Sequence, residues 1–298
     1  MANIGLIDCD QTNFPNLALM KIAAYHRKKG NKVEMLNSFQ QYDKVYISKV
    51  FDDVYSKFSE PFILSDEIVR GGTGYGLNNK LPGEIEHIKP AYDLYNIKNT
   101  AYGFLTRGCP RACPFCIVAE KEGRKSEKVA DLNEFWTDEK NIVLLDPNIL
   151  ACKDCENLLL QLAESKAVVD FTQGLDARLL TKEIIELLNK INIKVVHFAW
   201  DLPQFSDSIL KGLELYSKFG KIHNVRNRKV YMITNFGTTH EYDLFRVKKL
   251  QELNYDPYVM IYNKPTAPKI TRQLQRYCNN KFVFMAAKSF DDYLNYAR

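Results

Sequence analysis

The sequence predicts an α/β protein in which a small α/β domain precedes a partial, six-unit parallel β/α barrel. From residue 100 onward, short β-branched runs alternate with apolar residues at helical spacing. Residues 1–70 show a separate and smaller α/β pattern. Residues 71–99, with a GGTGYG run and two prolines, read as the connector between them. At 298 residues the chain is long enough for two such domains.

Six β-branched runs predict the strands of the barrel, and each run ends in polar residues. They lie at residues 101–106, 141–146, 167–173, 194–200, 229–235 and 258–263. The helical patterns between and after them lie at residues 152–166, 181–192, 204–219, 240–253 and 266–278. Strands that alternate with helices form a parallel sheet, and right-handed crossovers let six units curl into an open barrel. Functional sites in such folds lie at the carboxyl ends of the strands.

Residues 1–70 predict a Rossmann-like domain with strands at 4–8, 32–36 and 44–50 and a helix at 16–29 that ends at Gly30. Either Asn13 or Asn16 is expected to cap this helix, with Pro15 close to its first turn. The glycine run at 71–76 could wrap a phosphate through its backbone N–H groups. Because it is neither a Walker loop nor a G-x-G-x-x-G sequence that opens a helix, we expect instead a flexible connector that acts as a hinge over the barrel mouth. Residues 100–298 then form the barrel and a C-terminal extension.

The composition describes a globular protein that we expect to be soluble and cytoplasmic. Hydrophobic residues make up 46% of the chain and charged residues 26%. No apolar run approaches the length that spans a bilayer, and the first residues lack the basic region of a signal peptide. Seven cysteines in a reducing compartment favour metal binding or catalysis over a disulfide framework.

The net charge of +5 is concentrated in two basic segments. Residues 264–298 hold seven Lys or Arg against two Asp, and residues 221–229 hold no acidic residue. Such segments can bind phosphates or nucleic acid, but they are more often solvated faces. Nucleic acid is therefore a possible partner and not the favoured one.

Cys109, Cys113 and Cys116 carry the strongest chemical signal in the sequence. Their C-x3-C-x2-C spacing follows the first predicted barrel strand directly, in a segment whose glycine and prolines favour a loop. Thiolates so close together converge most easily on one metal centre, and they suit zinc or an iron–sulfur cluster. A structural zinc site needs a fourth ligand, for which the candidate pair is Cys152 and Cys155. Three protein ligands on a [4Fe–4S] cluster would leave one iron open to a substrate.

At these residues the sequence resembles the radical S-adenosylmethionine (SAM) superfamily, whose hallmark is C-x3-C-x-aromatic-C with Phe115 here at the aromatic position. The βα rhythm extends the resemblance over residues 100–280. The resemblance implies that the three cysteines ligate a [4Fe–4S] cluster and that SAM chelates the open iron. It also implies that Phe115 lies beside the adenine. The implied reaction is reductive cleavage of SAM to a 5′-deoxyadenosyl radical, with an electron from a partner such as flavodoxin or ferredoxin.

Polar residues after the second and third barrel strands are expected to complete the SAM site. Asp146 and Asn148 stand where many members of the superfamily carry a Gly-Gly-Glu segment for the SAM amino group. Gln173, Asp176 and Arg178 are candidate ligands of the ribose and carboxylate, and Arg178 can bond a carboxylate in bidentate fashion. The alternative for these last three is a helix cap with a surface ion pair. Later strands end in residues that belong either to the pocket or to ordinary turns: Trp200, Asp201, Asn235 and Asn263.

The front domain resembles the cobalamin-binding-type α/β domain that precedes the barrel in one branch of the superfamily. The resembling segments are residues 7–21, Gly30 and the strand at 33–36. The Asp-x-His-x-x-Gly loop that supplies the lower ligand of cobalt is absent, and His26 lies inside the predicted helix, where we expect a surface residue. We therefore expect this domain to bind no cobalamin and to form a wall or lid of the barrel mouth.

The remaining four cysteines are expected to be structural. Cys9 and Cys278 sit in or beside apolar runs and are interpreted as core residues. Cys152 and Cys155 could hold part of an auxiliary cluster, but two cysteines do not make a complete site, and we expect them to bind no metal.

The sequence therefore predicts a cytoplasmic radical SAM enzyme of unknown substrate. Within the enzyme class the alternative is a cobalamin-dependent or thiol-transferring radical SAM enzyme that modifies RNA. Outside it, the alternative is an iron–sulfur or zinc binding module without turnover.

Overall fold

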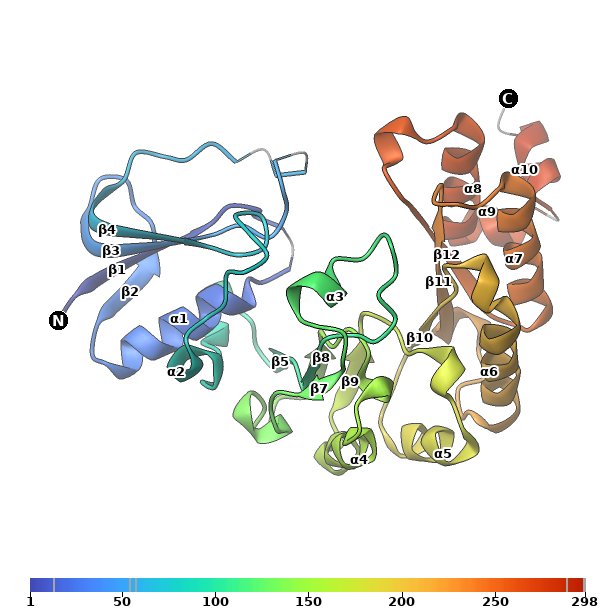
Figure 1. Ribbon diagram of the computed structural model, residues 1–298, viewed down its shortest axis with the longest axis horizontal. Helices are drawn as coiled ribbons and strands as arrows, with labels where there is room; N and C mark the ends of the chain where they lie inside the picture. The colour runs from blue at the N-terminus through green and yellow to red at the C-terminus, as the bar shows by residue number, and fades with distance from the viewer. Residues whose placement is uncertain (13, 54, 57, 288, 297–298) are drawn as a thin grey trace.

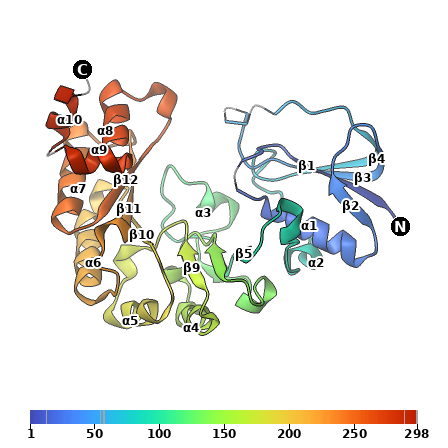
Figure 2. The ribbon, with the colours of Figure 1, turned by 180° about the vertical axis from the view of Figure 1, so that it is seen from behind.

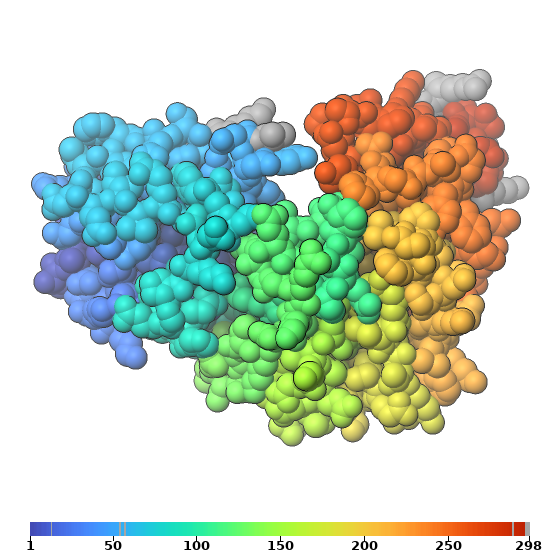
Figure 3. All heavy atoms as spheres, viewed as in Figure 1, coloured from blue at the N-terminus to red at the C-terminus, as the bar shows by residue number. Residues whose placement is uncertain are grey.

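The computed structural model describes residues 1–298 apart from 13, 54, 57, 288 and 297–298. The chain is a mixed α/β protein with parallel sheets, as the sequence predicts. The N-terminal sheet and its helix lie to one side of the remaining strands (Figures 1 and 2). A notch separates the N-terminal part from the C-terminal helices in the space-filling view, and the segment that contains α3 (Val118–Lys121) lies at its base (Figure 3).

The front domain is a four-stranded parallel sheet covered by one long helix. Its strands are β1 (Asn3–Asp8), β2 (Lys32–Met35), β3 (Gln41–Ser48) and β4 (Leu64–Gly71), in the order β2-β1-β3-β4. Helix α1 (Leu17–Lys28) packs Leu19 and Ile22 against the sheet. Asn16 caps α1, since its side chain accepts a hydrogen bond from the Leu19 amide at 3.2 Å. Asn13 lies outside the described residues.

Strand β4 was not expected from the sequence. Its residues, LSDEIVRG, include three charges, and every side chain is exposed or half-buried because β4 is the edge of the sheet. An edge strand has no second neighbour to bury its side chains, so the apolar alternation that identifies inner strands is weak.

The connector contains short helices and packs against both parts of the chain. Helix α2 (Gly83–Glu86) places Ile85 in the front-domain core, and turn η1 (Tyr92–Tyr95) places Tyr92 in the main core. Gly72 and Gly74 lie so close to the backbone of residues 49–51 that a Cβ on either would overlap a carbonyl oxygen. The glycine run expected to be a hinge therefore serves close backbone packing in this structure.

The second part of the chain holds two three-stranded parallel sheets. The first has the order β5 (Thr100–Gly103), β8 (Asn141–Leu144), β9 (Val168–Phe171), and the second β10 (Val196–Ala199), β11 (Arg228–Thr234), β12 (Asp256–Ile261). A parallel bridge between Leu175 and Phe198 joins the segment after β9 to β10, where the Leu175 amide donates to the His197 carbonyl at 2.7 Å.

Helices cover one face of these strands (Figure 1). They are α4 (Cys155–Ser165), α5 (Lys182–Lys190), α6 (Ser206–Phe219), α7 (His240–Glu252) and α8 (Lys269–Asn279), followed by α9 (Lys281–Ala286) and α10 (Phe290–Tyr296). Short 3₁₀ turns lie in the connections between strands and helices: η2 (Leu132–Glu134), η3 (Ile149–Ala151), η4 (Ala177–Leu179), η5 (Pro203–Phe205), η6 (Val225–Asn227) and η7 (Lys264–Thr266). The last predicted barrel helix starts three residues late, at 269, because Pro268 disfavours helical backbone in the residue before it.

One large core lies between these helices and the strands. Val230 and Met232 of β11 belong to it, together with Ile185 of α5, Leu213 of α6 and Leu250 of α7. The alternate residues Lys229 and Tyr231 are only half-buried and face the other way. In the described part of the chain, no helix combines the length and apolar character needed to cross a bilayer.

The contact between α6 and η4 depends on a residue without a side chain. A Cβ on Gly212 would overlap the backbone carbonyl of Ala177. We expect Gly212→Ala to lower the free energy of unfolding by about 1–3 kcal/mol, since the helix would have to move away from the turn. Lys211→Ala, at the exposed neighbouring position, is the matched control and should change it by less than about 0.5 kcal/mol. Urea denaturation followed by circular dichroism measures both, and equal stabilities would contradict the packing role.

Candidate metal centre

The cysteine motif lies in a loop whose two ends are paired by a short antiparallel ladder, two residues long on each side. Strands β6 (Thr106–Arg107) and β7 (Glu127–Lys128) pair antiparallel and close the loop at its base. Gly108 has φ +82°, and a Cβ there would overlap the carbonyl oxygen of Lys125. The Cys109 amide donates to the Gly123 carbonyl at 3.1 Å. The residue before Cys109 must therefore be glycine for the loop to close.

The three thiols lie near the surface of this loop. Cys109 and Cys113 are half-buried and Cys116 is exposed, while the Cys116 amide donates to the Cys113 carbonyl at 2.9 Å. Ala112 has a left-handed φ of +45°, which turns the chain immediately before Cys113. Burial raises the pKa values of Cys113 and Cys116, and nearby Asp201 and the neighbouring thiols raise them further. The bare thiols therefore favour the neutral form, and a cationic centre is what would stabilise three thiolates here.

As the side chains stand, the described residues contain no group of three or more His, Cys, Asp or Glu arranged to hold a metal ion. The donor chemistry nevertheless fits an iron–sulfur cluster, because three cysteines share one short loop and the thiol of Cys109 faces a buried amide. The amide nitrogen of Asn148 lies 3.7 Å from that sulfur. Hydrogen bonds to cluster sulfurs are a common second feature of such sites.

Asn148, Asp176 and Arg178 are brought together beside the cysteine loop. The Asn148 side chain donates to Asp176 Oδ2 at 3.1 Å, and Arg178 binds Asp176 through two hydrogen bonds of 2.7 and 3.0 Å. Because the carboxylate requires the amide nitrogen to face it, the Asn148 oxygen points elsewhere. That oxygen is buried and has no hydrogen-bond partner in the described structure. It is an acceptor available to a ligand ammonium group.

Arg111 completes this cluster, and sequence reasoning did not single it out. Its Nε donates to Asp176 Oδ2 at 2.7 Å, so the loop between Cys109 and Cys113 is tied to the end of a distant strand. Burial alone would raise the pKa of Asp176, but hydrogen bonds from Arg178 and Arg111 outweigh it and hold the pKa below its usual value. In the sequence, the signal for Arg111 was its position between Cys109 and Cys113, because its partner Asp176 lies 65 residues away.

The side chain of Asp146 is bonded to neighbouring residues of the fold. Its carboxylate accepts from the amides of Leu105 and Thr106 at 3.1 and 2.5 Å and from the Thr106 hydroxyl at 2.7 Å. Burial raises the pKa of Asp146 to about 6, against the lowering effect of these hydrogen bonds. The carboxylate thus joins the end of β8 to the chain that enters the cysteine loop.

Phe115 and Gln173 have other surroundings. The ring of Phe115 packs edge to face on Phe236 with centroids 5.3 Å apart, and Phe236 packs on Tyr262 at 4.8 Å. Gln173 lines a cavity on the helix-free side of the second sheet. Asp201 was expected to belong either to the pocket or to an ordinary turn. Its side chain is half-buried and accepts a hydrogen bond from the Ile233 amide at 2.9 Å. Burial raises the pKa of Asp201.

The other four cysteines are buried. Cys152, Cys155 and Cys278 belong to the main core, and Cys9 belongs to a second apolar cluster of the front domain that also holds Ile7 and Val45. This confirms the prediction for Cys9 and Cys278. His26 is also buried, with hydrogen bonds to the Tyr46 hydroxyl at 3.0 Å and the Asn31 amide at 3.1 Å. The expectation that His26 is a surface residue was wrong, because α1 turns this position toward β3.

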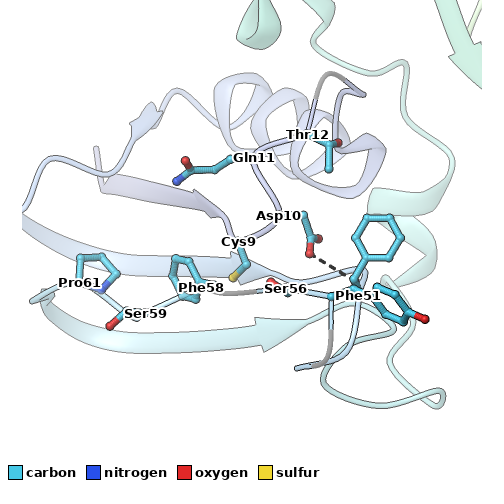
Figure 4. Close-up of a pocket in the computed structure, with 10 residues that line it drawn as sticks. Cys9, Asp10, Gln11, Thr12, Phe51, Ser56, Phe58, Ser59 and Pro61 are labelled. Carbon is cyan, nitrogen blue, oxygen red and sulfur yellow. Dashed lines mark hydrogen bonds between the residues drawn. The ribbon is translucent and has the colours of Figure 1, made fainter. Parts of the chain in front are cut away.

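A cavity of about 720 Å³ lies at the carboxyl ends of β1 and β3 in the front domain (Figure 4). The strand order reverses between β1 and β3, because β2 lies beyond β1 at one edge and β4 lies beyond β3 at the other. Open α/β sheets bind ligands at such a reversal of strand order. Asp10 lines it, and its carboxylate accepts from the amides of Val50 and Phe51 at 2.6 and 3.3 Å.

Neither protein-family models nor curated proteins give a match to this chain.

Asp146→Asn tests the structural role of that carboxylate. The amide has one acceptor oxygen for the three donors, so at least one buried donor loses its partner. We expect the free energy of unfolding to fall by about 1–3 kcal/mol. Asp138→Asn, on an exposed turn, should change it by less than about 0.5 kcal/mol. Chemical denaturation measures both, and a variant as stable as the parent chain would show that the three hydrogen bonds are dispensable.

Proposed function

We propose that this protein is a radical SAM enzyme whose cysteine loop holds a [4Fe–4S] cluster through Cys109, Cys113 and Cys116. The observation that carries the proposal is the grouping of the C-x3-C-x-aromatic-C loop with Asn148, Asp176 and Arg178. When bound, the cluster supplies the electron that cleaves the sulfonium bond of SAM. An external one-electron donor such as flavodoxin or ferredoxin is part of the proposal.

The residues around the loop have distinct roles in holding SAM. The unpartnered oxygen of Asn148 accepts from the SAM ammonium group, and Arg178 offers its guanidinium to the carboxylate. Asp176 holds Arg178 and Arg111 in place, so it acts as a positioning residue. Phe115 and Phe236 supply apolar surface beside the loop, which favours an aromatic ring and excludes water.

The fold proposed for this activity is one curved parallel sheet of six strands, a partial barrel. The two three-stranded sheets share the helix-covered core, and the Leu175–Phe198 bridge lies between β9 and β10. In that arrangement the carboxyl ends of all six strands face the cysteine loop, which is where parallel α/β folds build their sites.

Replacing Cys109, Cys113 and Cys116 together by Ala tests the cluster. Anaerobic reconstitution of the parent chain should give about four irons and four sulfides per chain, the content of a [4Fe–4S] cluster. We expect the triple variant to hold almost none, with unchanged circular dichroism. The matched control is Cys152→Ala with Cys155→Ala, which should keep the full iron content. Iron retained by the triple variant would contradict the assignment.

Asn148→Leu tests the SAM site separately from the cluster. The change keeps the side-chain size but removes both the acceptor oxygen and the amide group that donates to Asp176, so SAM affinity should fall about tenfold or more while iron content stays the same. Asn157→Leu on the exposed face of α4 is the control and should bind SAM as the parent chain does. Equilibrium dialysis with labelled SAM measures both. Equal affinity in the two variants would remove Asn148 from the site.

A further inference from the structure

The front-domain cavity at the carboxyl ends of β1 and β3 takes no part in holding the cluster or SAM. Its lining comes from the segment that follows β1 and from the segment between β3 and β4 (Figure 4). Its volume of about 720 Å³ is that of a small-molecule site, and it lies where the strand order of the sheet reverses. The side chains in this lining therefore indicate what kind of molecule it accepts.

Aromatic rings make up much of the apolar surface of the cavity. Phe51 is 47% exposed and Tyr55 is 61% exposed, although both line the cavity. Phe58 is half-buried and packs against the apolar cluster of Ile7 and Val45. Large rings left open to solvent beside a cavity mark a surface that a ligand can cover.

The charge of the lining is negative. Asp10 lines the cavity, and among the described lining residues there is no Lys or Arg. Its carboxylate accepts from the amides of Val50 and Phe51 at 2.6 and 3.3 Å, which fixes its position and leaves further acceptor sites on both oxygens. The ammonium group of Lys49, close by in the chain, is paired with Asp53. The cavity therefore offers a fixed carboxylate to a positively charged ligand.

The hydroxyl of Ser56 is the third element of the site. Ser56 lines the cavity, is only 8% exposed, and its Oγ has no hydrogen-bond partner in the described structure. The Ser56 amide donates to the Asp52 carbonyl at 2.8 Å, so the backbone at this position is held. Buried hydroxyls nearly always have a partner, and here a polar group of a ligand can supply it.

We propose that this cavity binds an organic cation, an alkylated ammonium group that carries a hydroxyl on one of its chains. The rings of Phe51 and Tyr55 attract the alkylated ammonium through their faces, and Asp10 supplies the opposite charge. Ser56 forms a hydrogen bond with the hydroxyl of the ligand. A phosphate or another anion does not suit the cavity, because the Asp10 carboxylate would repel it.

The role of charge is tested by calorimetric titration of the full chain with choline and with 3,3-dimethylbutan-1-ol. The second compound has the same shape, with carbon in place of the charged nitrogen. We expect choline to bind about tenfold more tightly, because rings and carboxylate both favour the cation. Asp10→Asn should reduce this preference to within about threefold. Asp66→Asn, at an exposed position of β4, is the control and should leave it unchanged. Equal binding of the two compounds, or no binding of choline at millimolar concentration, would overturn the inference.

Variants of Tyr55 test the ring contact with little risk to the fold, because this side chain is largely exposed. Tyr55→Leu should weaken choline binding about fivefold, and Tyr55→Phe, which keeps the ring, should stay within about twofold of the parent chain. Circular dichroism checks that each variant is folded. Choline affinity that is unchanged in folded Tyr55→Leu would contradict the cation–ring contact.

Tetramethylammonium tests the hydroxyl contact, because it carries the charge of choline without its hydroxyl. The parent chain should bind choline about threefold more tightly than tetramethylammonium, and Ser56→Ala should abolish that difference. A difference that persists in Ser56→Ala would remove Ser56 from the site.

Two further outcomes separate this inference from other assignments. Stoichiometric retention of hydroxocobalamin after desalting would assign the cavity to a corrinoid and overturn the inference. The titrations need neither iron nor SAM, so they are independent of the proposed function. A chain that binds choline but holds no iron would keep the cavity assignment and remove the radical SAM activity, and a chain that cleaves SAM without binding choline would do the reverse.

Discussion

The carboxylate of Asp176 accepts hydrogen bonds from Arg111 in the cysteine loop, from Asn148 after β8 and from Arg178 in η4. These three segments are far apart in the chain, and the one buried side chain holds them at a common point. Removal of one partner from such a buried network leaves an uncompensated charge, which costs more than the pair contributes. The position of the candidate SAM ligands relative to the three thiols therefore depends on Asp176.

The front domain is joined to the same loop by a second charge network. Glu86 accepts from Lys21 of α1 and from Arg107, two residues before Cys109, each at 3.0 Å. Arg107 also pairs with Glu122 on the far side of the loop at 2.9 Å. Burial lowers the pKa of Lys21, and Glu86 opposes that effect. Together these contacts place the front domain against the base of the loop.

Two kinds of surface meet around the loop, and they suit the two parts of the proposed reaction. The charged side, with Asp176 and Arg178, matches a zwitterionic ligand. The aromatic side consists of Phe115, Phe236 and Tyr262, whose rings pack edge to face.

The sequence by itself determined the parallel α/β class, the inner strands and the three-cysteine loop, and it narrowed the α1 cap to Asn13 or Asn16, because these follow from local periodicity and from residue chemistry at short spacing. It missed β4, whose edge position leaves no apolar alternation, and it placed His26 on the surface because helical spacing alone does not say which neighbour a face meets. Only the tertiary structure decided that Asp146 accepts from two backbone amides and the Thr106 hydroxyl, that Asn148 keeps a free acceptor and that Arg111 reaches Asp176. Each of these depends on contacts between residues 28 to 65 positions apart, and a linear pattern carries no information about which distant partner a polar side chain will find.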